Sequence, residues 1–166
     1  MIDKHKKAIL AVSFGTTHKD TMEKTINKIE DRIREEFSDY EVRRAFTAHI
    51  VLKVLRTRDG IIENNPEEAL EKLKHEGYEE VIVQPLHIIP GEEYDYIKHV
   101  VDNFRRDGVF KKILLGRPAL YFKGEQNLPD DYGIFVDSIK EIAPAASFEF
   151  SFTAIFDKPA SFITNA

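Results

Sequence analysis

The sequence predicts an α/β fold with three layers (αβα), in which helices cover both faces of a mainly parallel sheet. Two apolar runs carry this prediction, because each ends in small or polar residues followed by helical spacing: 7–13 and 81–86. Short apolar runs of this kind are typical of strands that are buried on both faces. Strands that alternate with helices favour parallel pairing, and such folds bind ligands at the loops that leave the carboxyl ends of the strands.

Apolar residues at helical spacing follow the first strand. They predict one long amphipathic helix with Thr16 or Thr17 near its N-cap. The residues of this stripe are Met22, Ile26, Ile29, Ile33 and Phe37. Residues 41–46 are expected to form the next strand.

Residues 48–57 are expected to form a second helix. Its apolar side would contain Ile50, Val54 and Leu55, and Asp59-Gly60 would end it. The next helix has a clear start at 65–68, with Asn65 as N-cap, a proline at the first position and two early acids.

The helix that starts after Asn65 would place Ala69, Leu70 and Leu73 in the core, and Gly77 would end it. Four more elements follow with the same alternation of strand and helix. They are expected at 81–86 (strand), 92–104 (helix), 113–116 (strand) and 131–142 (helix).

We expect one main domain over residues 1–144 and an atypical tail over residues 145–166. The tail alternates phenylalanine with polar residues near its start, which is typical of a strand. Five of the 12 phenylalanines lie in it, at Phe148, Phe150, Phe152, Phe156 and Phe162. Such a tail is expected to pack on this chain or on a partner.

Composition excludes several classes of protein. The net charge of −5 and the lack of a basic block argue against a nucleic-acid binder. The chain has no cysteine, which excludes disulfides, thiolate metal sites and cysteine nucleophiles, and is compatible with a reducing compartment. No signal peptide or membrane span is recognisable. We therefore expect a cytoplasmic protein that binds neither nucleic acid nor membrane.

Several motifs in a fixed order resemble those of the anaerobic (class II) cobalt chelatases, which insert Co²⁺ into sirohydrochlorin during cobalamin (vitamin B12) synthesis. The resemblance runs from about Lys7 to about Ile142 and covers the first half of that family's length. The matching segments are 12–16 (Val-Ser-Phe-Gly-Thr), 44–47 (Arg-Ala-Phe-Thr), 55–61 (Leu-Arg-Thr-Arg-Asp-Gly-Ile), 65–70 with 77–78, and 83–94.

The resemblance implies a chelatase-like fold with the tetrapyrrole in a cleft between two α/β domains. It implies no cofactor beyond the divalent metal substrate, which is Co²⁺ or, alternatively, Ni²⁺ or Fe²⁺. The reaction exchanges two pyrrole protons for the metal, and neutral imidazoles and carboxylates suit both tasks. A homo-oligomer is also expected.

The chain departs from the family pattern in its metal ligands. Full-length members carry a Gly-His-Gly loop and a later histidine in a second domain, and this sequence contains no Gly-His-Gly. Phe14 stands where short, homodimeric relatives place a histidine. The chain is therefore expected to be a fragment or a divergent half-length member.

Glu93 is the candidate catalytic residue, as proton acceptor or ligand to the approaching metal, because the resemblance places it where the sister half has a metal-binding histidine. Glu92 is expected to support it. His87 is the second candidate metal ligand, because it lies close to Glu93 along the chain. The alternatives are that the two acids complement the dipole of a helix and that His87 is a core residue with one hydrogen bond.

The loop after the first strand is expected to bind the substrate. Its backbone N–H groups could hold carboxylates at a helix start, and the candidate residues are Ser13, Phe14, Gly15 and Thr16. Arg44 is the candidate partner for a substrate carboxylate, alongside Arg56 and Arg58. At least one of these arginines is expected to form a structural salt bridge instead, with Asp59 as a candidate partner.

Two other functions compete with cobalt insertion. The chain could be a non-catalytic half-domain that binds a tetrapyrrole or a metal, and then it would bind porphyrinoids without metallating them. It could also be a phosphate-binding α/β protein that uses residues 13–17, but it lacks the lysine and paired glycines of the known phosphate loops.

Overall fold

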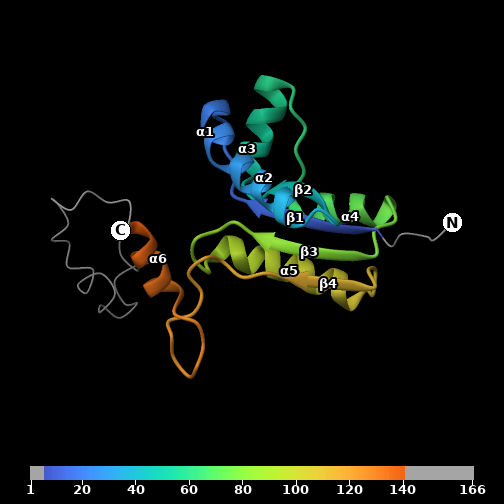
Figure 1. The fold of residues 1–166 in the computed structure, drawn as a ribbon. Coiled ribbons are helices and arrows are strands. Elements are labelled where there is room, and N and C mark those ends of the chain that lie inside the picture. The colour runs from blue at the N-terminus through green and yellow to red at the C-terminus, as the bar shows by residue number, and fades with distance from the viewer. Residues whose placement is uncertain (1–5, 141–166) are drawn as a thin grey trace, which may run out of the picture. The chain divides into compact units, whose positions relative to one another are not determined.

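The computed structural model describes residues 6–140, which form two compact units. The first unit ends at Asp131, and the second begins at Tyr132. The elements are labelled in Figure 1, and the two units are described separately. The predicted strand around Phe148 and the rest of the expected tail lie outside the described residues.

The first unit is built on a sheet of four parallel strands in the order β2-β1-β3-β4. The central strand β1 pairs with β2 on one side and β3 on the other, so Val12 lies opposite both Ala45 and Pro85. The strands are β1 (Lys7–Ser13), β2 (Glu41–Phe46), β3 (Glu80–Pro85) and β4 (Lys112–Leu115). All four predicted strands are confirmed, with bounds that shift by one residue at most.

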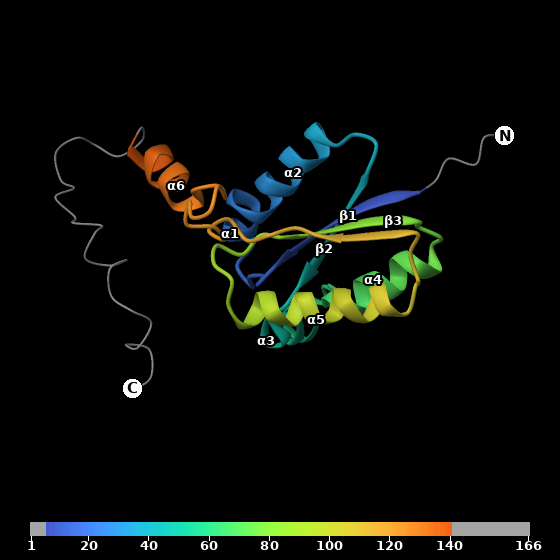
Figure 2. The same ribbon diagram turned by 90° about the horizontal axis from the view of Figure 1, so that it is seen from below.

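Helices cover both faces of this sheet, which confirms the three-layer prediction (Figure 2). One face carries α1 (Lys19–Lys24) and α2 (Ile26–Glu36). The other face carries α3 (His49–Val54), α4 (Pro66–His75) and α5 (Glu92–Arg106). The π-helical turn η1 (Leu55–Asp59) continues α3 and ends at Gly60, whose φ of 67° is left-handed.

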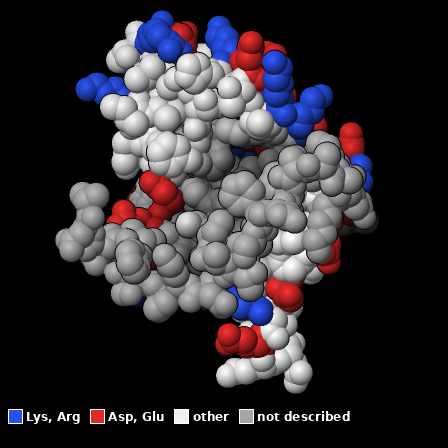
Figure 3. All heavy atoms as spheres, turned by 90° about the vertical axis from the view of Figure 1, so that its left-hand side faces the viewer, with Lys and Arg blue, Asp and Glu red and all other residues white. Residues whose placement is uncertain are grey.

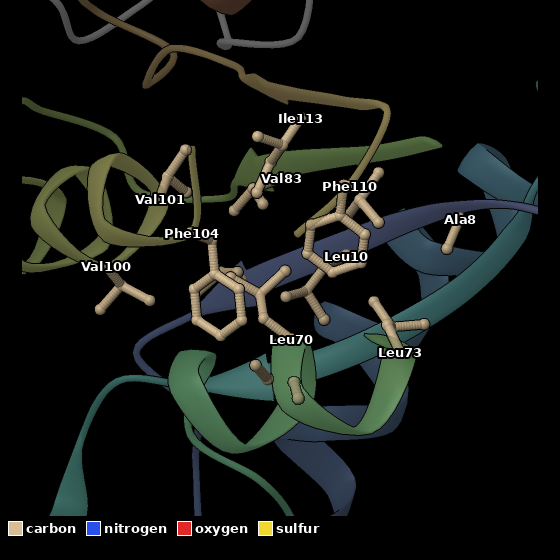
Figure 4. Close-up of a cluster of buried hydrophobic side chains, with 14 of the residues drawn as sticks. Ala8, Leu10, Leu70, Leu73, Val83, Val100, Val101, Phe104, Phe110 and Ile113 are labelled. Atoms are coloured by element: carbon tan, nitrogen blue, oxygen red, sulfur yellow. The ribbon is translucent and has the colours of Figure 1, made fainter. Parts of the chain in front are cut away.

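The main core lies between the sheet and the layer of α4 and α5 (Figure 4). Alternate residues of the strands point into it, among them Leu10 and Val83, and Leu70 of α4 and Val101 of α5 face them. All of these side chains are fully buried, and at about 25 cal/mol per Å² such burial is the main force that holds the layers together.

The long helix predicted after β1 is wrong in one respect, because the structure has two helices with a break at Thr25. The hydroxyl of Thr25 donates to the Thr21 carbonyl at 2.6 Å, and the Thr25 backbone leaves the helical region. Such a bond competes with the regular helix pattern and bends or ends helices. Two residues of the predicted stripe, Ile29 and Phe37, are also about half exposed.

The predicted apolar side of the helix at 48–57 is wrong at one residue, because Ile50 is 68% exposed and Val51 is buried in its place. Leu55 is buried as predicted. The start of α4 confirms Asn65 as N-cap and the proline at the first position. The Asn65 side chain accepts from the Glu68 backbone at 2.8 Å, and the Glu68 side chain accepts from the Asn65 backbone. This reciprocal capping box satisfies donors that the first turn leaves open.

The last predicted helix is confirmed as α6 (Asp131–Lys140), which begins at the boundary of the second unit. Asp131 itself belongs to the first unit, where it is buried and accepts hydrogen bonds from the backbone of Tyr121 and Phe122. No helix within residues 6–140 has an apolar stretch long enough to cross a bilayer.

Candidate functional site

The strand order places two loops side by side at the carboxyl edge of the sheet. The chain leaves β1 toward the layer of α1 and α2, and it leaves β3 toward α5 in the opposite layer. Because β1 and β3 are neighbours, the loops that begin at Phe14 and Leu86 diverge from one point, where folds of this class bind ligands. Figure 3 views this side of the molecule, on which acidic groups (red) and basic groups (blue) lie at several separate places.

His87 lies two residues beyond β3 and is half-buried. Both of its ring nitrogens are shielded from solvent, and neither has a hydrogen-bond partner within residues 6–140. Burial lowers the pKa of the imidazole, and the nearby carboxylate of Glu93 opposes this shift only in part. At neutral pH the ring is therefore uncharged and offers a lone pair, which is the form that binds a metal or accepts a proton.

Glu93 lies in the first turn of α5, with its side chain half-buried, whereas Glu92 is exposed. No side chain caps this helix end, whose N-cap is Gly91. The carboxylate of Glu93 is near enough to His87 to raise the pKa of the imidazole electrostatically, although burial has the larger effect. Glu92 precedes Glu93 in the same first turn, and its supporting role stays a prediction.

The pair His87 and Glu93 is a small ligand set. No group of three or more His, Asp or Glu side chains in residues 6–140 could hold a metal ion. A resident catalytic metal usually has three protein ligands, so an imidazole with one carboxylate suits a metal that passes through the site. The same groups can also accept protons.

Two buried hydroxyls lie at the same edge of the sheet, and neither has a hydrogen-bond partner in the part of the chain described. They belong to Ser13, the last residue of β1, and Thr47, the first residue after β2. The backbone N–H of Thr47 donates to the Ser13 carbonyl at 2.9 Å, so the two residues are adjacent. Sequence reasoning did not name Thr47 as a site residue. Its position directly after β2 could have identified it, because the predicted polar residues of the other loop follow β1 in the same way. Buried polar atoms without a partner are rare and mark positions for water or ligand.

The loop after β1 contains an exposed aromatic ring and a tightly packed glycine. Phe14 is 51% exposed at the carboxyl end of β1. Gly15 has φ of +90°, and a Cβ there would lie 2.6 Å from the Phe46 ring, so only glycine fits. Thr16 accepts a hydrogen bond from the backbone N–H of His18 at 3.2 Å. The N-cap of α1 is His18, so both threonines lie near the helix start as predicted.

Arg44 is held in an internal ion pair, which argues against its predicted role in substrate binding. Its guanidinium donates to both carboxylate oxygens of Glu30, at 2.7 and 2.6 Å, and to Asn27 at 2.5 Å. The Glu30 side chain is 1% exposed, and Glu63 lies 3.6 Å from the same guanidinium. The geometry gives Arg44 the structural task of joining α2 to β2.

The other two arginines differ from each other. Arg58 forms the expected pair with Asp59 at 2.7 Å and also donates to the Thr17 carbonyl at 2.6 Å, so it fastens η1 to the loop after β1. Arg56 is exposed, and its side chain has no partner among the described residues. His18, His49 and His99 are exposed as well.

A similar fold occurs in the crystal structure of a protein from Marinobacter aquaeolei VT8 that is described as a cobalamin (vitamin B12) biosynthesis CbiX protein. The TM-score is 0.52 at 16% sequence identity, and the match covers 82% of this chain and 93% of that one. At this identity the likeness concerns the fold, which confirms the predicted chelatase-like architecture.

Two curated relatives share much more sequence with this chain. The sirohydrochlorin cobaltochelatase of Salmonella typhimurium is 44% identical over 115 residues, which are 69% of this chain and 43% of that protein. The sirohydrochlorin cobaltochelatase CbiKC of Nitratidesulfovibrio vulgaris is 36% identical over 124 residues, or 72% and 42% of the two chains. The chain thus spans less than half the length of the curated relatives it matches.

The sequence profile described as "Cobalt chelatase (CbiK)" matches residues 7–153, which is most of the chain. This range contains the loop after β1, Arg44, His87 and both glutamates of the first turn of α5. The chain therefore belongs to the cobalt chelatase (CbiK) family.

Proposed function

We propose that this chain takes part in the insertion of Co²⁺ into sirohydrochlorin, with His87 and Glu93 at the point where metal and macrocycle meet. One observation carries the proposal: at the carboxyl edge of β1 and β3, both ring nitrogens of His87 are buried without a hydrogen-bond partner among residues 6–140, and the carboxylate of Glu93 acts electrostatically on this imidazole. The names of the curated relatives supply the substrate and the metal.

The reaction requires two tasks of the protein, which are metal delivery and proton acceptance. Co²⁺ replaces two pyrrole protons, so the site must deliver the cation and accept protons as the metal–nitrogen bonds form. His87 would hold the metal through a ring lone pair, and Glu93 would accept a proton or ligate the metal on its approach. Glu92, exposed at the same helix end, would keep the local potential negative for an incoming cation.

The loop after β1 would form the opposite wall of the substrate site. The exposed ring of Phe14, together with the exposed Ile88 and Ile89 after β3, offers an apolar surface to the flat macrocycle. Ser13, Gly15 and Thr16 would contribute polar contacts close to the backbone. No cofactor beyond the metal substrate is required, and Ni²⁺ or Fe²⁺ would suit the same ligands.

A homo-oligomer would complete the site, because a second copy would bring a second imidazole and carboxylate. Two ligands from one chain fall short of the usual three, and the exposed apolar side chains around them would be covered by a partner. We place the reaction in the cytoplasm, as the lack of cysteine allows. Sedimentation at several protein concentrations tests the oligomeric state.

The experiment that tests the function is anaerobic incubation of the purified chain with sirohydrochlorin and Co²⁺, followed by the absorbance change of metallation. We expect the rate to exceed that of a protein-free control and to fall at least about tenfold in Glu93→Gln. Glu125→Gln, which removes an exposed carboxylate from the loop after β4, is the matched control and should keep the unmodified rate. A rate equal to that without protein would contradict the proposal.

A second function is favoured by the small ligand set. The described residues contain no group of three or more candidate metal ligands. A chain with only two ligands would bind the tetrapyrrole without accelerating metallation. Binding of metal-free sirohydrochlorin, with no acceleration at any protein concentration, would support this non-catalytic alternative.

A further inference from the structure

The chain runs on beside the loop of His87 after β4 has ended (Figure 1). The backbone N–H of Ala119 donates to the His87 carbonyl at 3.1 Å. The next N–H, of Leu120, donates to the Ile88 carbonyl at 2.8 Å. These two bonds prolong the parallel pairing of β3 with β4 beyond the strands themselves. The backbone of His87 is therefore held by the segment 117–122.

The segment 117–122 also contacts the first turn of α5. The ring of Tyr121 lies 5.8 Å from the ring of Tyr94 in an edge-to-face arrangement, and Tyr94 directly follows Glu93 in the sequence. Tyr94 is buried, and edge-to-face pairs of this kind are attractive beyond the area that they bury. One segment thus contacts both elements that carry the candidate metal ligands.

A single buried carboxylate fixes the shape of this segment. Oδ2 of Asp131 accepts from the backbone N–H groups of Tyr121 and Phe122, at 3.0 and 2.8 Å. Oδ1 accepts from the Arg117 guanidinium at 2.8 Å. The hydrogen bonds, that from Phe122 foremost, lower the pKa of the Asp131 carboxyl, so it is ionised at neutral pH. Hydrogen bonds to an ionised acceptor are stronger than those to a neutral one.

Asp131 is also the first residue of α6, where an acid complements the helix dipole. That role alone does not explain its contacts, because the three donors named above all lie in the segment 117–122. The backbone N–H of Asp131 in turn donates to the Phe122 carbonyl at 3.0 Å. The Arg117 guanidinium lies 4.8 Å from the centre of the Phe122 ring. Asp131 therefore joins the two ends of the segment to each other.

We propose that Asp131 is a positioning residue for His87 and Glu93, an inference that rests on the proposed function. While its carboxylate holds the segment 117–122, the carbonyls of the His87 loop keep their donors and Tyr121 stays packed on α5. Without it, two backbone N–H groups and a guanidinium lose their acceptor, and the segment loses its fixed shape. Groups that orient a metal ligand affect metal binding and activity although they do not touch the metal.

The first test is nuclear magnetic resonance of the metal-free full chain, so that it does not depend on metallation. In Asp131→Ala we expect the amides of Ala119 and Leu120 to exchange at least about tenfold faster and the ring signals of His87 to shift. Asp131→Asn keeps a carbonyl oxygen for the two backbone N–H groups and should stay close to the unmodified chain in both respects.

The matched control is Leu73→Ala, which removes a fully buried side chain at the end of α4. The Leu73 carbonyl accepts from the N–H of Tyr78, just before β3, so this residue lies toward the opposite edge of the sheet. The variant should be less stable, because it leaves a cavity, but the His87 ring signals should not move. A loss of stability alone is thereby separated from a change at the site.

The unmodified chain provides a measurement that does not depend on how a variant folds. If Asp131 holds the whole segment, the amides of Ala119, Leu120, Tyr121 and Phe122 should open together and exchange at similar rates. Slow exchange at Ala119 and Leu120, with free exchange at Tyr121 and Phe122, would overturn the proposal. Unchanged His87 ring signals in Asp131→Ala would overturn it as well.

The second test is the single-turnover rate of Co²⁺ insertion into sirohydrochlorin. We expect Asp131→Ala to slow insertion at least about tenfold, and Asp131→Asn to restore the rate to within about threefold of the unmodified chain. Equal rates for Asp131→Ala and the unmodified chain would overturn the positioning role and leave the proposed function intact. If the unmodified chain does not accelerate insertion, the proposed function falls, and the resonance experiment still decides whether Asp131 positions His87.

Discussion

At the scale of single residues, Gly15 cannot be replaced without a loss of stability. Its φ of +90° is left-handed, and an added Cβ would meet the Phe46 ring at 2.6 Å. We expect Gly15→Ala to lower the free energy of unfolding by about 2–4 kcal/mol, because backbone strain and overpacking add. Gly108 separates the two effects, since its φ is +62° but nothing lies within 4 Å of its Cβ position. Gly108→Ala should cost only about 1 kcal/mol in denaturant titrations.

The buried carboxyl of Glu63 makes the stability of the folded chain depend on pH. Burial raises the pKa of this carboxyl, and Arg44 offsets the rise only in part. Between the ordinary value of 4.5 and the raised value, the folded chain binds more protons than the unfolded chain, so stability falls as pH increases through this range. In Glu63→Gln this loss is absent.

Urea titrations from pH 4 to pH 8 measure this effect as a difference between two proteins. The stability of Glu63→Gln relative to the unmodified chain should improve with rising pH and then level off. A difference that stays constant with pH would show that burial of Glu63 has no energetic consequence.

At the scale of elements, the attachment of α2 to β2 depends on one buried ion pair. Glu30 is fully buried, and the half-buried Arg44 binds both of its carboxylate oxygens. Removal of either residue leaves the other with a weaker contact only, from Arg34 to Glu30 at 3.3 Å or from Arg44 to Glu63 at 3.6 Å. We expect Glu30→Ala or Arg44→Ala to lower the free energy of unfolding by about 3–5 kcal/mol, and Glu30→Leu/Arg44→Met to lose far less. The exposed pair Arg32 and Glu36 on the same helix is the control, and its removal should cost under about 1 kcal/mol.

This ion pair also shows where prediction from sequence ends. The strands and the start of α4 were predictable because apolar runs and the Asn65-Pro66 cap are local signals. Glu30 lies among charged residues of an amphipathic helix and reads as solvent-exposed, and its partner Arg44 is on a strand 14 residues further along. Only the packing of α2 on β2 reveals the pair, so the sequence alone could not decide whether Arg44 is free to bind substrate.

The candidate site was partly predictable for a similar reason. Parallel strands bring their following loops to one edge, and this rule is enough to predict that Ser13, His87 and Glu93 lie in the same region. The lowered pKa of His87 and the unpartnered hydroxyl of Thr47 depend on burial, which no sequence pattern reports. Likewise, the break at Thr25 arises from a local hydrogen bond that apolar spacing does not encode.

At the scale of the whole molecule, the chain provides one α/β unit and a pair of candidate ligands, whereas the portion it matches is less than half of each curated relative. If a second copy completes the site, the metallation rate per chain should rise with protein concentration as dimers form. Stopped-flow rates over a hundredfold concentration range, compared with sedimentation, test this dependence. A rate per chain that is constant while the oligomeric state changes would contradict it.

The central claim is that His87 and Glu93 act together on the metal during its insertion. The most direct measurement is the single-turnover rate of Co²⁺ insertion into sirohydrochlorin by the unmodified chain, His87→Ala, Glu93→Gln and the double variant. We predict that each single change slows insertion at least about tenfold and that the double variant is no slower than the slower single variant, as for residues that act as a unit. Unchanged single-variant rates, or losses that simply multiply, would contradict the claim.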